Sequence, residues 1–164
     1  IAGEKLTADI GQFMREEHNM LVGDASLESI KLSVGSAYPL KEELTTQVRG
    51  RDLLTGLPKE ITITSEEVRK AMHRSVKSIV SAIKNTIEET PPELIADLLN
   101  RSIFIAGGGS LLRGLDELVS FETKLPVKVV DDPLTSVVRG CGLILEHLDT
   151  FKSVLVGTAK EAYS

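Results

Sequence analysis

The feature that most constrains the fold is an apolar run at residues 103–106, followed at once by glycines at 107–109. Four successive apolar residues are typical of a strand buried on both faces. A helical pattern then covers 110–124, residues 127–130 form a second buried-strand candidate, and a further helical stripe covers 134–148. This order of strand, glycine turn, helix, strand and helix predicts an α/β fold.

The last of these predicted helices carries a continuous apolar stripe. Its apolar residues recur at helical spacing: Leu134, Val137, Val138, Cys141, Leu145 and Leu148. Asp132 and Pro133 precede them, and we expect these two residues to be the N-cap and the first helical residue. Because Cys141 lies on the stripe, we expect a small core residue there rather than a nucleophile.

The first part of the chain predicts two helices and a small β region. Residues 4–21 carry an apolar face at helical spacing, and Asp24 is expected to be the N-cap of a second helix over 25–34. Residues 45–51 look extended, and 60–64 alternate polar and β-branched apolar residues. We therefore expect these two segments to form a hairpin.

A capping box predicts the start of the longest helix. Thr64 and Glu67 have the spacing at which each side chain satisfies a free backbone N–H at a helix start. Apolar residues at spacings of three and four follow over 68–87, before Pro91 and Pro92 end the pattern. Residues 93–99 then predict a short helix.

Charge and composition narrow the class of protein. The 164 residues carry 19 Lys and Arg against 24 Asp and Glu, a net charge of −5, which disfavours binding to nucleic acid. No apolar run approaches the roughly 20 residues that span a bilayer. The lone Cys141 cannot form an internal disulfide. We expect a cytoplasmic, soluble chain, and the initial Ile1 in place of Met suggests a fragment of a longer protein.

The glycine triplet is the first candidate site. Glycine lets a ligand approach the backbone closely, so Gly107, Gly108, Gly109 and the following Ser110 suggest a nucleotide or phosphate site. The run matches neither the GxGxxG nor the P-loop pattern, and an ordinary structural turn explains it equally well.

The second candidate is the segment Glu28, Ser29, Ile30 and Lys31. Glu28 and Lys31 are three residues apart on one helical face, where they could hold a ribose hydroxyl and a base edge. Taken alone, the pair is explained better as an exposed ion pair worth tenths of a kcal/mol.

No arrangement of residues predicts catalysis. His18, His73 and His147 lie on three different predicted helices, and neither they nor Cys141 have the spacing of a zinc site or of a nucleophile with its base. The acidic pairs Glu42-Glu43 and Asp131-Asp132 are explained better as caps and solvated turns than as a metal site.

Eight short stretches, in order, resemble a known family. They are residues 2–5 (AGEK), 30–31 (IK), 35–39 (GSAYP), 48–53 (VRGRDL), 56–58 (GLP), 90–94 (TPPEL), 107–116 (GGGSLLRGLD) and 132–135 (DPLT). Together they are similar to the MreB family of bacterial actin-like, rod-shape-determining proteins, over about residues 1–148.

The resemblance implies a fold and a domain division. The chain would be domain II, the C-terminal lobe of a ribonuclease H-like actin fold, with a small α+β insertion. Residues 1–20 and 90–148 would form the larger subdomain, and 21–89 the smaller inserted one. Residues 149–164 would be a C-terminal tail without a strong match.

The resemblance also implies a nucleotide site. Gly107, Gly108, Gly109 and Ser110 would be the adenosine motif, and Glu28, Ser29, Ile30 and Lys31 would close over the nucleoside. ATP with Mg²⁺ would bind in the full-length protein. The family's phosphate loops and catalytic acid precede the region present here, so we expect this chain alone to bind ATP weakly or not at all and to hydrolyse it negligibly.

The implied function is that of the nucleotide-binding lobe of an ATP-dependent, filament-forming cytoskeletal protein that determines bacterial cell shape. The expected partners are further copies of the protein and cell-shape or membrane-associated proteins, without nucleic acid and without direct membrane contact from this chain. The full-length protein would be cytoplasmic and membrane-associated. The alternatives are a non-catalytic adaptor that retains the domain II fold, and a chaperone of the same superfamily.

Overall fold

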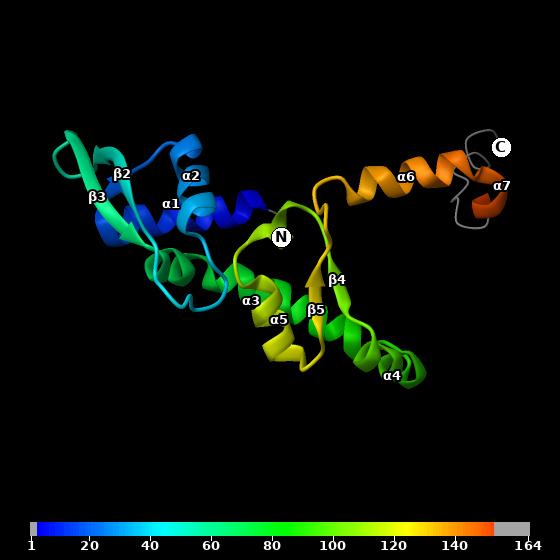
Figure 1. Ribbon diagram of the computed structural model, residues 1–164. Coiled ribbons are helices and arrows are strands. Elements are labelled where there is room, and N and C mark those ends of the chain that lie inside the picture. The colour runs from blue at the N-terminus through cyan, green and yellow to red at the C-terminus, as the bar shows by residue number, and fades with distance from the viewer. Residues whose placement is uncertain (1–2, 153–164) are drawn as a thin grey trace, which may run out of the picture.

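The structure is a computed structural model that describes residues 3–152 (Figure 1). Residues 153–164 of the predicted tail lie outside this range. The elements follow in chain order: α1 (Gly3–His18), β1 (Met20–Leu21), α2 (Asp24–Val34), β2 (Thr45–Asp52), β3 (Pro58–Thr64), α3 (Ser65–Glu88), α4 (Pro92–Asn100), β4 (Ile103–Ile105), the short 3₁₀ helix η1 (Gly108–Leu111), α5 (Leu115–Thr123), β5 (Val127–Val129), α6 (Ser136–Glu146) and α7 (Leu148–Phe151).

The predicted hairpin is confirmed as part of a three-stranded antiparallel sheet. The strand order is β1-β2-β3, and β2 pairs with β3 from Thr45 opposite Thr64 to Arg51 opposite Pro58. Oδ1 of Asp52 accepts hydrogen bonds from the backbone N–H groups of Leu54 (2.8 Å) and Thr55 (2.9 Å). An Asx turn of this kind closes the hairpin.

The first helix ends earlier than the sequence pattern predicts. We expected helix over 4–21, but α1 ends at His18 because Asn19 adopts a left-handed backbone conformation with φ of 48°. Met20 and Leu21 then pair with Asp52 and Arg51 as strand β1. Met20 is fully buried from this strand, whereas Leu21 is 43% exposed.

The cap predicted for the second helix is also wrong. Asp24 is the first residue of α2, and the N-cap position is held by Gly23, which makes no side-chain cap bond. The carbonyl of Gly23 accepts the N–H groups of Ser26 and Leu27. The Asp24 carboxylate lies in the first turn, where it complements the helix dipole.

The capping box at the start of α3 is confirmed. The Thr64 hydroxyl accepts the N–H of Glu67 at 3.2 Å, and the Glu67 carboxylate accepts the N–H of Thr64 at 2.8 Å. The helix is 24 residues long and ends before the prolines as predicted. The short helix predicted over 93–99 is α4.

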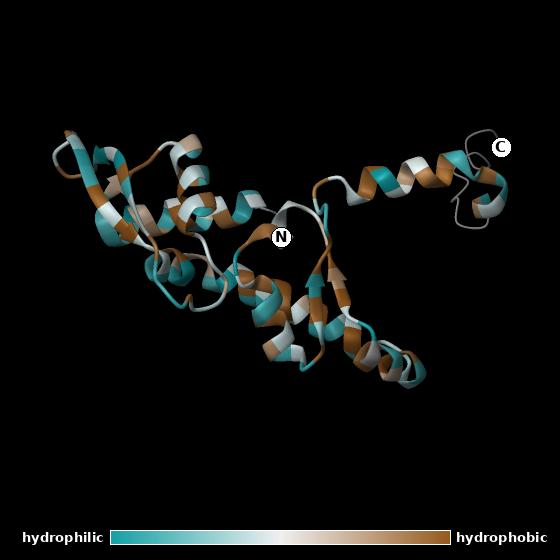
Figure 2. Ribbon diagram, viewed as in Figure 1, coloured by the Kyte–Doolittle hydropathy of each residue, from teal (hydrophilic) through white to brown (hydrophobic). Residues whose placement is uncertain are grey.

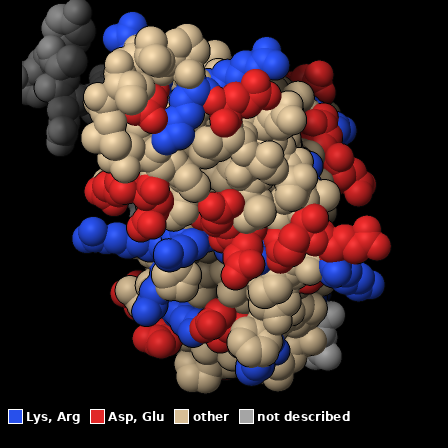
Figure 3. All heavy atoms as spheres, turned by 90° about the vertical axis from the view of Figure 1, so that its left-hand side faces the viewer, with Lys and Arg blue, Asp and Glu red and all other residues tan. Residues whose placement is uncertain are grey.

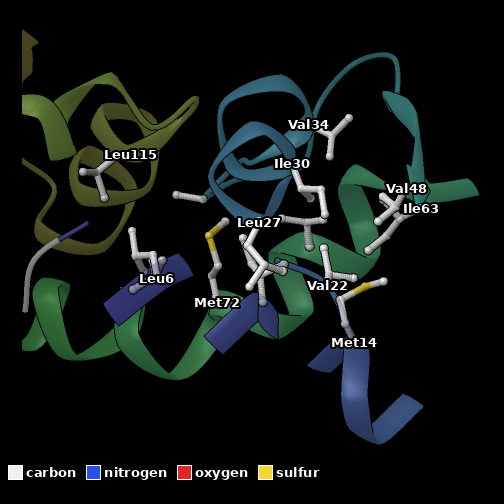
Figure 4. Packing of buried hydrophobic residues seen from close by; sticks show 14 of the residues in the cluster. Leu6, Met14, Val22, Leu27, Ile30, Val34, Val48, Ile63, Met72 and Leu115 are labelled. Atoms are coloured by element: carbon white, nitrogen blue, oxygen red, sulfur yellow. The ribbon is translucent and has the colours of Figure 1, made fainter. Parts of the chain in front are cut away.

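The core lies where α1, α2 and α3 meet the three-stranded sheet (Figure 4). Each element contributes the apolar residues of one face; those with the least exposure are Ile10, Met14, Met20, Val34, Ile63, Val68 and Met72. The core continues toward α5 through Leu115 and Val119. The side of α2 that carries Ile30 is thereby fixed against α1 and α3.

The two predicted buried strands form a parallel pair, β4 and β5, but they are not covered on both faces. Ile105 and Val127 pack against the core, whereas Phe104 is 65% exposed and Lys128 is exposed. Within residues 3–152, the face of the pair that carries Phe104 and Lys128 is therefore open. The expectation of burial on both faces is therefore wrong for the described chain.

The last major helix, α6, extends away from the rest of the molecule (Figure 1), and it carries brown apolar residues on its surface (Figure 2). It begins at Ser136 rather than after Asp132, whose backbone carbonyl accepts the Ser136 hydroxyl at 2.5 Å. None of its residues is buried, and Cys141 is exposed. The predictions of an Asp132 N-cap, a Pro133 first residue and a core Cys141 are wrong.

Acidic and basic side chains are interleaved on the hairpin side of the molecule (Figure 3). Ion pairs in this region include Arg49 with Glu60 at 3.1 Å and Arg69 with Glu43 at 2.7 Å. The exposed Arg49–Glu60 pair contributes about 0–1 kcal/mol, whereas the Arg69 side chain is 17% exposed and also donates to Ser36 Oγ and the Tyr38 carbonyl. Among the helices of residues 3–152, none has the length and apolar character that crossing a bilayer requires.

Candidate functional site

A cleft of about 1040 Å³ lies between α1 and α2 on one side and the glycine turn on the other. Glu28 and Lys31 line the first side, and Gly108, Gly109 and Ser110 line the second. The floor is apolar; Ile79, Ile83 and Ile105 contribute to it. The fold therefore brings the two candidate segments, about 80 positions apart in the sequence, to one cleft.

A hydrogen-bonded network holds Glu28 and Lys31 in place. Nζ of Lys31 lies 2.7 Å from Oε2 of Glu28 and also donates to Thr7 Oγ1 (3.1 Å) and to the Gly3 carbonyl (3.2 Å). The hydroxyl of Thr7 lies 2.7 Å from the same Glu28 oxygen. Lys31, and then Thr7, hold the pKa of the Glu28 carboxyl below its usual value by hydrogen bonding to its charged form. Glu28 is therefore an anion at neutral pH.

The opposite side of the cleft is shaped by glycine backbone. Gly107 has φ of 84° and ψ of 166°, a region that other residues adopt only with strain, and its N–H donates to the Pro133 carbonyl at 2.7 Å. The buried Ser110 hydroxyl donates to the Gly107 carbonyl at 2.7 Å. A Cβ on Gly109 would meet no atom within 4 Å. Gly107 and Ser110 thus hold the turn, while Gly109 leaves open space beside it.

The two sides of the cleft are connected directly. The N–H of Ala37 donates to the Arg113 carbonyl at 2.7 Å, and Ser36 forms a parallel bridge with Arg113. Gly114, with φ of 70°, approaches Tyr38 so closely that an added Cβ would lie 2.8 Å from the Tyr38 Cβ. The chain after α2 and the chain after the glycine turn are therefore packed side by side.

The remaining candidate residues lie elsewhere. Ile30 is 3% exposed and belongs to the hydrophobic core. Ser29 is exposed, and neither residue lines the cleft. In the segment 28–31, the two charged residues, Glu28 and Lys31, line the cleft.

Thr7 and Arg113 are part of this arrangement, and the sequence reasoning did not identify them. Thr7 lies 21 positions before Glu28, and no motif connects the two. The only signal is that Thr7 follows the buried Leu6 and so lies at the edge of the buried face of α1. Arg113 falls within the 107–116 stretch, but its contact with the end of α2 depends on the tertiary fold.

The chemistry of the cleft suits a ligand with a flat apolar part and hydroxyl groups. The apolar floor can pack against a ring, and glycine allows close approach from one side. The Glu28 carboxylate can accept hydrogen bonds from hydroxyl groups on the other. Among residues 3–152, no group of three or more His, Cys, Asp or Glu side chains is placed to hold a metal ion.

Comparisons with known proteins agree on one family. The profile of the family described as MreB/Mbl protein matches residues 1–153. The chain is 41% identical over 149 residues to the cell shape-determining protein Mbl of Bacillus subtilis (strain 168), covering 91% of this chain and 45% of that protein. It is 42% identical over 149 residues to the cell shape-determining protein MreB of Escherichia coli (strain K12), covering 91% of this chain and 43% of that protein. The chain thus spans about half the length of these curated relatives.

A solved structure agrees with the fold. The crystal structure of MreB 5 of Spiroplasma citri bound to AMPPNP matches with a TM-score of 0.86 and 32% sequence identity, covering 94% of this chain and 47% of that chain. The predicted α/β fold class and its actin-like architecture are confirmed by this likeness. Together with the family profile, this also confirms the resemblance drawn from the sequence, and the chain belongs to the MreB/Mbl family.

Proposed function

We propose that this chain is the nucleotide-binding lobe of an ATP-dependent, filament-forming protein that determines bacterial cell shape. The observation that carries the proposal is the meeting of Glu28 and Lys31 with Gly108 to Ser110 at one cleft. The name of the Spiroplasma citri relative supports it, since that protein was crystallised with AMPPNP. The Bacillus subtilis and Escherichia coli relatives support the cell-shape role by their names.

ATP fits the residues that line the cleft. The open space beside Gly109 admits close approach of a ligand, and the apolar floor offers a surface for the adenine ring. Glu28 presents a carboxylate to the ribose, while Gly107 and Ser110 hold the turn that faces the nucleotide. The bound nucleotide would supply the phosphoanhydride bond. We assign no residue of this chain to Mg²⁺.

The proposal includes the wider organisation of the protein. Residues 1–20 and 90–148 form the larger subdomain and 21–89 the smaller one, with the cleft between α1, α2 and the glycine turn as the nucleotide site. The protein assembles with further copies of itself into filaments. It acts in the cytoplasm in association with the membrane and with other cell-shape proteins.

Nucleotide binding tests the proposal most directly. The affinity of a fluorescent ATP analogue is measured for the protein as its gene encodes it, and for Glu28→Ala combined with Lys31→Ala. The double variant is expected to bind at least about tenfold more weakly, because it loses a charged pair at the cleft.

Arg49→Ala combined with Glu60→Ala is the matched control, because it removes an exposed ion pair of the hairpin, away from the cleft. This control is expected to bind ATP as the unaltered protein does. Equal affinity of the double variant and the unaltered protein would remove the assignment of the site. No binding by the unaltered protein would favour the non-catalytic adaptor instead.

A further inference from the structure

We propose that Thr7 is a positioning residue of the nucleotide site, which fixes Glu28 so that one carboxylate oxygen bonds to protein and the other is left for the sugar of the nucleotide. This inference rests on the proposed function. It concerns a residue on α1 that does not itself line the cleft. The hydrogen-bond donors and acceptors of Lys31, Thr7 and Glu28 support this role of Thr7.

Lys31 has no donor left for a ligand. A lysine ammonium carries three N–H donors, and Nζ has three acceptors: Glu28 Oε2 at 2.7 Å, Thr7 Oγ1 at 3.1 Å and the Gly3 carbonyl at 3.2 Å. The Lys31 side chain is 13% exposed, so water contributes little to its hydrogen bonding. Lys31 therefore supports the site rather than bonding to the nucleotide.

The Thr7 hydroxyl has a single proton to donate. Its possible acceptors are Glu28 Oε2 at 2.7 Å and the Gly3 carbonyl, four residues earlier on α1, at 3.1 Å. The carboxylate is both nearer and charged, so it takes the proton. The hydroxyl then donates to Glu28 and accepts from Lys31, which closes a triangle of three side chains.

This triangle leaves one oxygen of Glu28 for a ligand. Oε2 receives both Thr7 and Lys31, whereas within residues 3–152 the other oxygen, Oε1, receives no hydrogen bond. The Glu28 side chain is 46% exposed and lines the cleft. A carboxylate oxygen accepts hydrogen bonds and donates none when ionised. The group that it recognises is therefore a donor. ATP offers the two ribose hydroxyls and the 6-amino group of adenine, and we assign the ribose hydroxyls to Oε1.

The experiment compares ATP with 2′,3′-dideoxy-ATP, which lacks both ribose hydroxyls, by equilibrium binding to the protein as its gene encodes it. The unaltered protein is expected to bind ATP at least about tenfold more tightly than the dideoxy analogue. Thr7→Val, which removes the hydroxyl and keeps the shape of the side chain, should weaken ATP binding roughly three- to tenfold. Its affinity for the dideoxy analogue should stay within about twofold. Thr7→Ser, which restores the hydroxyl, should recover the preference for ATP.

Each other result overturns the inference in a recognisable way. Equal weakening of both nucleotides by Thr7→Val would make Thr7 merely structural, and no weakening would make it irrelevant. Equal binding of both nucleotides by the unaltered protein would show that Glu28 does not read the sugar, although the nucleotide site would stand. Failure of the unaltered protein to bind ATP would instead remove the proposed function.

A second measurement does not depend on the nucleotide. Loss of the Thr7 hydrogen bond should raise the pKa of the Glu28 carboxyl, which ¹³C NMR of the side chain can follow. Thr7→Ala, with the better helix propensity, serves if Thr7→Val does not fold. An unchanged pKa in the folded variant would contradict the inference.

Discussion

The guanidinium of Arg113 donates a hydrogen bond from Nη1 to the backbone carbonyl of Leu32, 2.8 Å away. The same nitrogen lies 3.4 Å from the Gly35 carbonyl. A cation thus bonds to carbonyls at the C-terminus of α2, the helix that carries Glu28 and Lys31. The segment after the glycine turn thereby fixes the end of the helix across the cleft.

Replacement of Arg113 by Ala should lower the free energy of unfolding by about 1 kcal/mol, because the two carbonyls lose a charged donor. Urea denaturation followed by circular dichroism measures the change. Arg139→Ala is a suitable control, since Arg139 lies on α6 with its side chain 71% exposed and only a 3.9 Å ion pair to Asp132. The same loss in both variants would contradict the role given to Arg113.

The glycines of the turn should differ in their tolerance of Ala. Gly107→Ala places a Cβ on a residue with φ of 84° and should cost about 1–3 kcal/mol of stability. Gly109→Ala introduces no contact within 4 Å and should change stability by less than about 0.5 kcal/mol. Thermal unfolding of both variants tests the difference. A stable Gly107→Ala protein would contradict the strained conformation of the turn.

The core at α3 should respond strongly to loss of volume. Met72 is fully buried, so Met72→Ala should destabilise the protein by about 2–5 kcal/mol through lost burial and a residual cavity. Met72→Leu keeps most of the volume and should cost less than about 1.5 kcal/mol. Chemical denaturation measures the free energy of unfolding of both variants. Equally small losses in the two would contradict the close packing around Met72.

The hairpin turn should titrate in acid. The Thr55 N–H, and then Lys59, hold the pKa of Asp52 at about 2, below its ordinary value of 3.8. A lowered pKa means that the folded state binds the proton less readily, so the turn is stabilised above about pH 4 and loses this stabilisation as the pH falls toward 2. The amide proton shifts of Leu54 and Thr55 should follow this titration, with a midpoint near 2.

Asp52→Asn provides the control for that titration. The amide oxygen can still accept from the two N–H groups, but it has no proton to gain in this range. The acid titration of the Leu54 and Thr55 shifts should therefore disappear. A midpoint near 3.8 in the unaltered protein would show that the turn does not hold the carboxylate.

The exposed stripe on α6 should govern self-association of the chain. Val137 is 73% exposed and Leu145 is 66% exposed, and no residue of α6 is buried. Changing both to Gln should leave the free energy of unfolding of this chain within about 0.5 kcal/mol of its original value, while association at high concentration decreases. Analytical ultracentrifugation measures the association. Unchanged association would show that another surface is responsible.

The sequence predicts elements whose signals are local. The capping box of Thr64 and Glu67 and the helix stripe starting at Val68 depend on residues three and four positions apart, so both could be predicted. Cys141 shows the limit of this reasoning. A stripe predicts that one face of a helix is apolar, but only the neighbouring elements decide whether that face is covered, and within the described residues it is not.

The site shows the same limit. The two candidate segments could be located because glycines and a charged pair are visible in the sequence, and the family resemblance connected them. The bond between Thr7 and Glu28 could not be predicted, because it depends on how α1 and α2 pack. The same packing turns Ile30 into the core although it lies between two residues of the cleft.

The hydrogen bond between Gly107 and Pro133 couples the position of the glycine turn to that of α6. The N–H of Gly107 donates to the carbonyl of Pro133, 2.7 Å away, and the Leu134 side chain lies against Gly108, so the glycine turn is joined to the segment that leads into α6. Any backbone shift at the turn must either stretch this bond or carry Pro133 with it. Because α6 extends outward from that segment (Figure 1), a small rotation at the turn would displace the far end of the helix more than its first residues.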